Sequence, residues 1–151
     1  MKFLLLLICS LTCLVGCHPS PSVQDSAGRR IELSDLHGKW LIVNYWADWC
    51  HPCLTELPEL NRLQNHHKAE LQVIGVNFDH LPAADLQAFA QKLGVQFSLV
   101  SEFPSEAYHL PAVSSLPVTF VINPQGKLVE TLYGPQTEES ISGLAARAPK
   151  S

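Results

Sequence analysis

The stretch from Trp40 to Cys53 constrains the fold more than any other part of the chain. Trp40 to Trp46 is a nearly continuous apolar run, which is typical of a strand that is covered on both faces of a sheet. Cys50 to Lys68 is predicted to be a helix, with Cys50 and Cys53 at its start. A fully buried strand that leads into a helix predicts an α/β domain, with two thiols where strand and helix meet.

The remaining segments extend this sheet and cover it. The first strand, the helix and the following strand require a right-handed crossover and a parallel pair. The turn Asn123–Gly126 joins two strands in an antiparallel hairpin. We therefore expect a mixed central sheet with helices on both faces. Further strands are predicted at Ile31–Leu33, Leu71–Phe78, Phe97–Val100, Pro117–Ile122 and Lys127–Tyr133, and further helices at Ala83–Leu93, Ser105–His109 and Thr137–Arg147.

Residues 1–16 have the features of a secretory signal peptide. Lys2 precedes an apolar stretch that is shorter than the ~20 residues of a membrane-spanning helix. Its end, Leu14-Val15-Gly16-Cys17, resembles the bacterial lipoprotein signal, in which cleavage precedes a cysteine that then carries lipid. The resemblance implies an exported protein, anchored at the periplasmic face of a bacterial membrane through Cys17. Residues 17–25 are expected to form a flexible tether before a domain at 26–151.

The cysteine content narrows the chemistry. Of five cysteines, Cys9 and Cys13 leave with the signal peptide and Cys17 is lipidated, so Cys50 and Cys53 remain. A lone C-x-x-C pair in an oxidising compartment predicts a redox centre, because a disulfide across so small a loop constrains the unfolded chain little. No second C-x-x-C or H-x-x-x-H completes a zinc site. A formal net charge of −4 argues against nucleic-acid binding.

The position of the pair at a helix start explains how it would react. Unpaired backbone N–H groups and the positive end of the helix dipole favour the thiolate of Cys50, the attacking species in disulfide exchange. A protonated His51 would add positive charge, and Pro52 suits the first helical turn because its missing N–H is harmless there. Cys53 lies on the same helical face and is the expected resolving thiol. This chemistry requires no metal and no organic cofactor.

The segment Trp49-Cys50-His51-Pro52-Cys53 resembles the active site of the thioredoxin-like superfamily. Its surroundings resemble the TlpA/ResA branch of exported, membrane-tethered thiol–disulfide oxidoreductases, over nearly the whole length from Ser26 onward. The resemblance implies a thioredoxin-like fold with an N-terminal β extension and a helix–strand insertion. Further matching segments are Leu33–Lys39, Val43–Ala47, Glu56–Pro58, Ser115–Phe120 and Val121–Lys127.

The resemblance also implies roles for residues outside the cysteine pair. Glu56 would lie near the thiols and relay a thiol proton, while Trp49 would offer substrates a hydrophobic platform. Pro117 matches the family's cis-proline facing the disulfide, and the backbone of Leu116 would pair with an extended substrate segment. Asn44 departs from thioredoxin itself, where a buried acid assists the inner cysteine, so we expect Glu56 to take over that role.

The direction of electron flow is open at this point. The TlpA/ResA resemblance implies a reductase of exported protein substrates, supplied with electrons by a membrane thiol transporter and serving cytochrome c maturation or thiol repair. His51 favours the opposite direction, because a cation beside the thiolate stabilises the reduced form and makes the disulfide more oxidising. A disulfide oxidase or isomerase of the same fold is therefore the alternative. We also expect the protein to act as a monomer.

Two other classes of protein are weaker candidates. A thiol peroxidase of this fold would need Thr or Ser three residues before its reactive cysteine, and Ala47 stands at that position. An exported copper-binding module would use two cysteines separated by three residues, together with a distant histidine. Cys50 and Cys53 are separated by two residues, which favours the redox pair.

Overall fold

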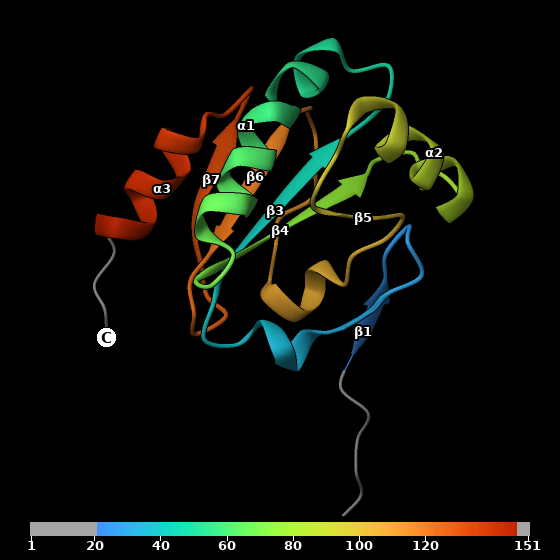
Figure 1. The fold of residues 1–151 in the computed structure, drawn as a ribbon. Coiled ribbons are helices and arrows are strands. Elements are labelled where there is room, and N and C mark those ends of the chain that lie inside the picture. Colours follow the sequence, from blue (N-terminus) through green and yellow to red (C-terminus); the bar gives the residue numbers. More distant parts are fainter. Residues whose placement is uncertain (1–20, 148–151) are drawn as a thin grey trace, which may run out of the picture.

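The computed structural model describes residues 21–147. The strands of its central sheet are β3 (Trp40–Trp46), β4 (Leu71–Asn77), β5 (Ser98–Val100), β6 (Val118–Ile122) and β7 (Leu128–Tyr133). Their order in space is β5-β4-β3-β6-β7, as Figure 1 shows. β3, β4 and β5 run parallel, while β6 is antiparallel to β3 and β7 is antiparallel to β6. The predicted mixed sheet is confirmed.

One face of this sheet is covered by α-helices. α1 (His51–His67), α2 (Ala83–Leu93) and α3 (Glu138–Arg147) all pack there. Their leucine and isoleucine side chains join Ile42 and Trp46 of β3 in one apolar cluster. α2 and β5 form the predicted helix–strand insertion, which widens the sheet beyond β4. None of the helices within residues 21–147 is both long enough and apolar enough to cross a membrane.

The opposite face is covered by shorter elements. These are two 3-10 helices, η1 (Leu33–Leu36) and η2 (Ser105–Tyr108), and a hairpin of β1 (Ser22–Gln24) and β2 (Arg30–Glu32). Their apolar side chains form a second cluster with the residues of the sheet that point to this side. Helical elements therefore lie on both faces, as predicted, although the helices on this side are single 3-10 turns.

β3 is buried on both sides because successive side chains of a strand point to opposite faces. Ile42 and Trp46 face the α-helices, whereas Leu41 and Val43 face the hairpin side, and none is more than 1% exposed. Asn44 is the polar exception on the α-helical side, and it is 0% exposed. A polar side chain in such a place needs hydrogen-bond partners, and the partners of Asn44 belong to the candidate active site.

The N-terminal hairpin corrects the predicted domain boundary. β1 and β2 pair in antiparallel fashion, with Val23 opposite Ile31. The prediction of a tether over 17–25 and a domain from 26 is therefore wrong for residues 22–25. Proline and serine suggested an unstructured segment, yet this short strand is stabilised by pairing with β2. The predicted signal peptide and the lipidated Cys17 lie outside the described residues.

Asp25 fixes the hairpin to the central sheet. Its side chain is 1% exposed, and its Oδ2 accepts hydrogen bonds from Arg29 Nε at 2.8 Å and from Ser98 Oγ at 3.1 Å. The backbone N–H of Ser26 also donates to the carbonyl of Leu99 at 2.7 Å. Ser98 and Leu99 belong to β5, so both contacts tie the hairpin to the edge strand. The hairpin is the predicted N-terminal β extension.

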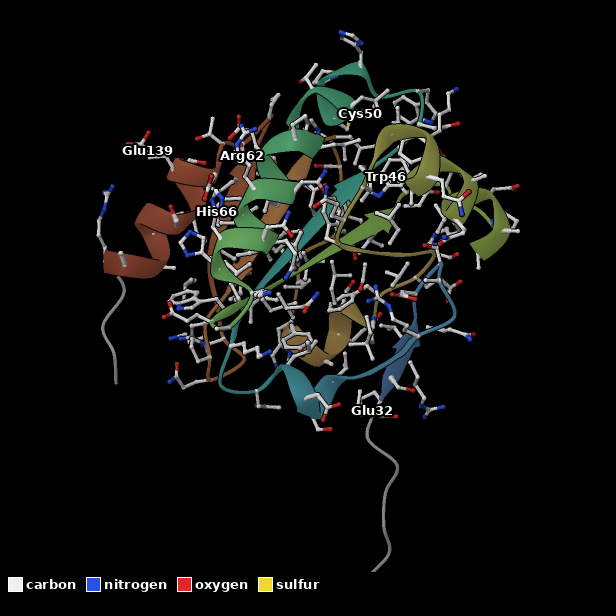
Figure 2. All side chains as sticks on the ribbon, in the orientation of Figure 1. Glu32, Trp46, Cys50, Arg62, His66 and Glu139 are labelled. Carbon is white, nitrogen blue, oxygen red and sulfur yellow. A yellow bond between two sulfur atoms is a disulfide. The ribbon has the colours of Figure 1, made fainter. Side chains whose placement is uncertain are left out.

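The start of α3 is held against α1. Figure 2 shows Arg62 and His66 of α1 on the side of α3. His66 Nδ1 lies 2.7 Å from Glu138 Oε1, and the backbone N–H of Glu138 donates to Glu59 Oε2 at 3.1 Å. These contacts fix the segment before α3, and with it the backbone of Gln136, beside α1.

Candidate active site

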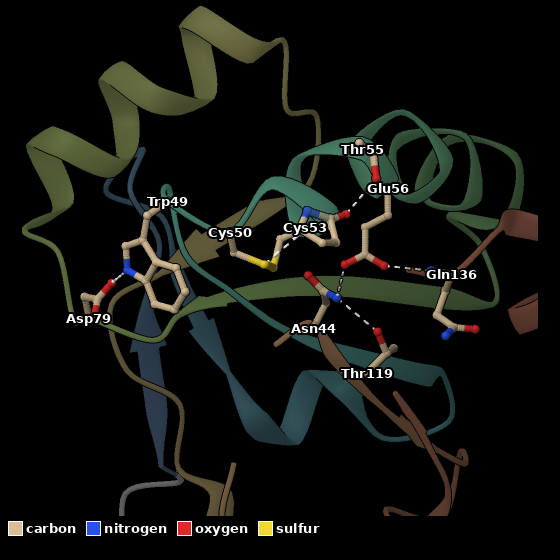
Figure 3. The surroundings of a disulfide bond; sticks show 10 residues. Asn44, Trp49, Cys50, Cys53, Thr55, Glu56, Asp79, Thr119 and Gln136 are labelled. Atoms are coloured by element: carbon tan, nitrogen blue, oxygen red, sulfur yellow. Dashed lines mark hydrogen bonds between the residues drawn. A yellow bond between two sulfur atoms is a disulfide. The ribbon is translucent and has the colours of Figure 1, made fainter. Parts of the chain in front are cut away.

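Cys50 and Cys53 form a disulfide at the start of α1, as Figure 3 shows. Their Cα atoms are 5.3 Å apart and their sulfur atoms 2.00 Å apart. Cys50 caps the helix, because its Sγ accepts a hydrogen bond from the Cys53 backbone N–H at 3.3 Å. Cys50 is 5% exposed and Cys53 is 0% exposed. Of the two sulfur-bearing residues, only Cys50 is accessible to a reagent. The backbone N–H groups at the helix start would stabilise its thiolate.

His51 and Pro52 are the first two residues of α1, and both are exposed. Pro52 therefore stands in the first helical turn, as predicted. His51 is in the predicted position next to Cys50, but its side chain lies in solvent, where salt screens charges. Its effect on the thiolate stays a prediction.

Trp49 lies at the rim of the site and is 65% exposed. Its indole Nε1 donates a hydrogen bond to Asp79 Oδ2 at 2.6 Å, which holds the ring beside the loop after β4 (Figure 3). The two residues meet because β3 and β4 are parallel, so the segments that follow them leave the sheet at the same end. Trp49 was predicted from the sequence as a hydrophobic platform for substrates, whereas Asp79 was missed. Its position just after a buried strand was the signal that could have identified it.

Leu116 and Pro117 reach the same end of the sheet from β6. The peptide bond between them is cis, and the next residue, Val118, pairs with Tyr45 near the end of β3. Pro117 is buried, and Leu116 is half-buried against the apolar cluster that contains both cysteines. The structure thus places this segment at the end of the sheet where β3 leads into α1, and the predicted position of Pro117 facing the disulfide stays a prediction. Its contact with a substrate stays a prediction.

Glu56 lies one helical turn after Cys53 and is buried behind the disulfide. It is 1% exposed. Its Oε1 accepts a hydrogen bond from Asn44 Nδ2 at 2.9 Å, and its Oε2 accepts one from the backbone N–H of Gln136 at 2.8 Å. Asn44 Nδ2 also donates to Thr119 Oγ1 at 3.0 Å (Figure 3). Figure 3 shows Glu56 on the same helix as Cys53, held by Asn44 of β3 and by the backbone just before α3. Its role in the chemistry of the thiols stays a prediction.

Burial changes the acidity of Glu56. Loss of solvent raises the pKa of its carboxyl to about 7, although the hydrogen bonds from Gln136 and Asn44 lower that pKa. Such a group is partly protonated at neutral pH, so it can release a proton or accept one. The contact with Gln136 has no signal in the sequence, because every residue except proline carries a backbone N–H.

The site lends no support to the two weaker candidate classes. Ala47 is 0% exposed and accepts a hydrogen bond from the Cys50 backbone N–H at 3.2 Å through its carbonyl, so a methyl group stands where a peroxidase of this fold needs a hydroxyl. Within residues 21–147, no group of three or more His, Cys, Asp and Glu side chains is arranged to hold a metal ion.

An oxidisable thiol pair at the start of the helix that follows the central strand defines a thiol–disulfide oxidoreductase. The chain belongs to the AhpC/TSA family, whose profile matches residues 17–131. Among similar proteins, thiol-disulfide oxidoreductase ResA of Bacillus subtilis (strain 168) is 37% identical over 124 residues, which cover 82% of this chain and 69% of the relative. ResA of Geobacillus thermodenitrificans (strain NG80-2) is 32% identical over 124 residues, covering 82% of this chain and 71% of the relative.

Solved structures share the fold. A thiol:disulfide interchange protein of the thioredoxin family from Chlorobium tepidum TLS superposes with a TM-score of 0.73 at 22% identity, covering 85% of this chain and 92% of that chain. StoA from Bacillus subtilis superposes with a TM-score of 0.66 at 22% identity, covering 85% and 98%. The predicted thioredoxin-like fold is confirmed.

The buried carboxyl of Glu56 should make folding stability depend on pH. Its pKa is about 7 in the folded protein and 4.5 is its ordinary value, so the folded state binds more protons between these values. The contribution of this carboxyl to the free energy of unfolding is fully present below pH 4.5. It falls by roughly 3 kcal/mol as the pH rises from 4.5 through 7. Glu56→Gln should abolish this loss, because glutamine does not titrate. Urea unfolding of the oxidised protein from pH 4 to pH 8 measures it.

Glu70→Gln provides the control for this experiment, because it makes the same change at an exposed residue. The free energy of unfolding of this variant should depend on pH in the same way as that of the wild type. Identical pH profiles for wild type and Glu56→Gln would contradict a carboxyl that titrates near pH 7.

Proposed function

We propose that this protein reduces disulfides in exported proteins, with Cys50 as the nucleophile and Cys53 as the resolving thiol. The observation that supports the proposal is the difference in solvent exposure between the two cysteines. Cys50 caps α1 and retains some exposed surface, whereas Cys53 is fully buried behind it. A substrate can approach the first sulfur only, and the second sulfur is held three residues further along the same helix.

The reaction follows from this arrangement. The Cys50 thiolate attacks one sulfur of a substrate disulfide, forms a mixed disulfide and expels the other substrate sulfur as a thiolate. Cys53 gives its proton to the Glu56 carboxylate and attacks Cys50 Sγ, which releases the second substrate thiolate and leaves the protein oxidised. Two electrons pass from the protein to the substrate, and a donor dithiol restores them. The pKa of about 7 suits Glu56 to this proton transfer.

Residues at the rim would hold the substrate chain. Trp49 is exposed and oriented by Asp79, so it offers an apolar surface next to Cys50. The backbone at Leu116 would pair with an extended substrate segment in the manner of an added strand. Such main-chain pairing tolerates many side chains, which suits an enzyme that acts on several exported proteins.

The cellular setting is part of the same proposal. The signal-like N-terminus and Cys17 support a lipid anchor at the periplasmic face of a bacterial membrane. An oxidising compartment cannot keep the pair reduced, so a membrane thiol transporter is the proposed electron donor. Cytochrome c maturation, which requires reduced cysteines, is the proposed process.

The roles of the two cysteines can be separated by trapping. Cys53→Ser should accumulate mixed disulfides with insulin, a small disulfide-bonded protein, because the intermediate at Cys50 can no longer be resolved. Cys50→Ser should accumulate none, because its remaining thiol is buried. Non-reducing electrophoresis and mass spectrometry detect the adducts. Equal trapping by both variants would reject the assignment.

The direction of electron flow can be read from the reduction potential. Thioredoxin lies at about −270 mV and the oxidant DsbA at about −120 mV. A reductase should lie nearer the first value, and equilibration with glutathione followed by thiol alkylation measures it. A potential close to that of DsbA would favour the oxidase instead. His51 would then account for it, because a cation beside the Cys50 thiolate stabilises the reduced form.

The lipid anchor has a direct chemical test. Protein extracted from bacterial membranes should begin at Cys17 and carry acyl chains on that residue, which mass spectrometry of the N-terminal peptide would detect. Cys17→Ala should release the protein from the membrane fraction. An unmodified mature protein that begins at another residue would rule the anchor out.

A further inference from the structure

Asn44 contains a buried polar atom that the proposed mechanism does not yet use. Within residues 21–147, the buried side-chain polar atoms without a hydrogen-bond partner are Asn44 Oδ1, Trp46 Nε1 and Asn77 Nδ2. The last two are donors, so Asn44 Oδ1 is the acceptor among them. An unpaired acceptor in a dry core is unfavourable, and such an atom points to a partner that is present in another state of the protein.

The orientation of this amide is fixed by its other end. Asn44 Nδ2 donates to Glu56 Oε1 at 2.9 Å and to Thr119 Oγ1 at 3.0 Å, so both of its hydrogens are engaged. When Glu56 is ionised, turning the amide over would place Oδ1 against a second acceptor and would leave the hydrogens of Nδ2 facing the disulfide. Oδ1 therefore stays on the side of the disulfide, toward which it points in Figure 3. Neither sulfur of a disulfide carries a hydrogen, so the oxidised pair cannot satisfy it.

We propose that Asn44 is a positioning residue that accepts a hydrogen bond from the thiol of Cys53 once the pair is reduced. The inference rests on the proposed thiol–disulfide exchange. In that step a donor dithiol gives two electrons and becomes a disulfide, and the bond between Cys50 and Cys53 breaks. Of the two protons that the donor loses, one goes to Cys53 and the other to solvent, while Cys50 remains a thiolate. The new S–H of Cys53 then donates to Asn44 Oδ1.

An asparagine suits this position better than an acid would. Its carbonyl accepts a hydrogen bond but cannot take the proton, so Cys53 remains a thiol and the negative charge stays on Cys50 at the helix start. The same side chain holds Glu56 through Nδ2. Asn44 thus contacts both Cys53 and the carboxyl that accepts the Cys53 proton in the next turnover. Because the hydrogen bond exists in the reduced state alone, it stabilises that state and raises the reduction potential.

The S–H stretching band in the infrared spectrum tests this directly, because a hydrogen-bonded thiol absorbs at lower frequency than a free one. The reduced-minus-oxidised spectrum of the full chain should show a lowered band for Cys53, assigned by its persistence in Cys50→Ser. Asn44→Leu should move that band to the frequency of a free thiol. Thr119→Val and Glu56→Gln each alter a partner of Nδ2 and spare Oδ1, so the lowered band should remain in both controls.

The reduction potential gives a second readout. Asn44→Leu should lower the equilibrium constant for reduction by glutathione about tenfold, which is about 30 mV for a two-electron couple, and Thr119→Val should change it much less. Should Asn44→Leu fail to fold, the wild-type spectrum decides alone, because a Cys53 band at the free-thiol frequency would overturn the inference. If that happened while Cys53→Ser still trapped substrates, the role of Asn44 would fail and the proposed function would stand. If Cys53→Ser trapped no substrate while the Cys53 band lay at a lowered frequency, the proposed function would be rejected and the role of Asn44 would stand.

Discussion

The burial of the Glu56 carboxyl behind the disulfide is the constraint on which the site depends. A carboxyl in a dry core is stable only if its oxygens are paired or it holds a proton. Here one oxygen is held by Asn44 of β3 and the other by the backbone of Gln136, just before α3. The register between β3 and β6, which pairs Asn44 with Thr119, keeps that amide in place. The packing of three separate elements thus converges on one buried carboxyl.

The helix–strand insertion contributes to the site as well as to the fold. The loop from β4 into α2 carries Asp79, which holds Trp49 beside Cys50. α2 itself packs its Phe89 against Trp46, with ring centroids 4.4 Å apart. Trp46 and Trp49, which both precede Cys50, are therefore held by one inserted segment. The exposed rim beside Cys50 depends on a part of the chain distant from the cysteines in sequence.

The elements that could be predicted from the sequence are those with a strong local signal. The ranges predicted for β3 and α2 agree with the observed bounds, and the cysteine pair was correctly placed at the start of α1. β1 was missed because its three residues are no more than half-buried and owe their stability to β2 and to Asp25. The contacts of Glu56 with Gln136 and of Trp49 with Asp79 depend on tertiary packing. Asn44 was noticed as a substitution, but the orientation of its amide could come only from its neighbours in space.

If Cys17 carries the proposed lipid, the attachment of the hairpin would also limit how the molecule stands on the membrane. The carbonyl of Pro21 accepts a hydrogen bond from the Leu33 N–H at 3.0 Å, close to where β3 begins, whereas Cys50 follows the end of that strand. The seven residues of β3 span about 23 Å. With the proposed lipid on Cys17, the chain to Pro21 would reach at most about 14 Å from the bilayer. The disulfide would then face the open compartment, where folded substrates meet it freely. A donor embedded in the bilayer would have to raise its dithiol to the height of the domain, or the domain would have to tilt down to it.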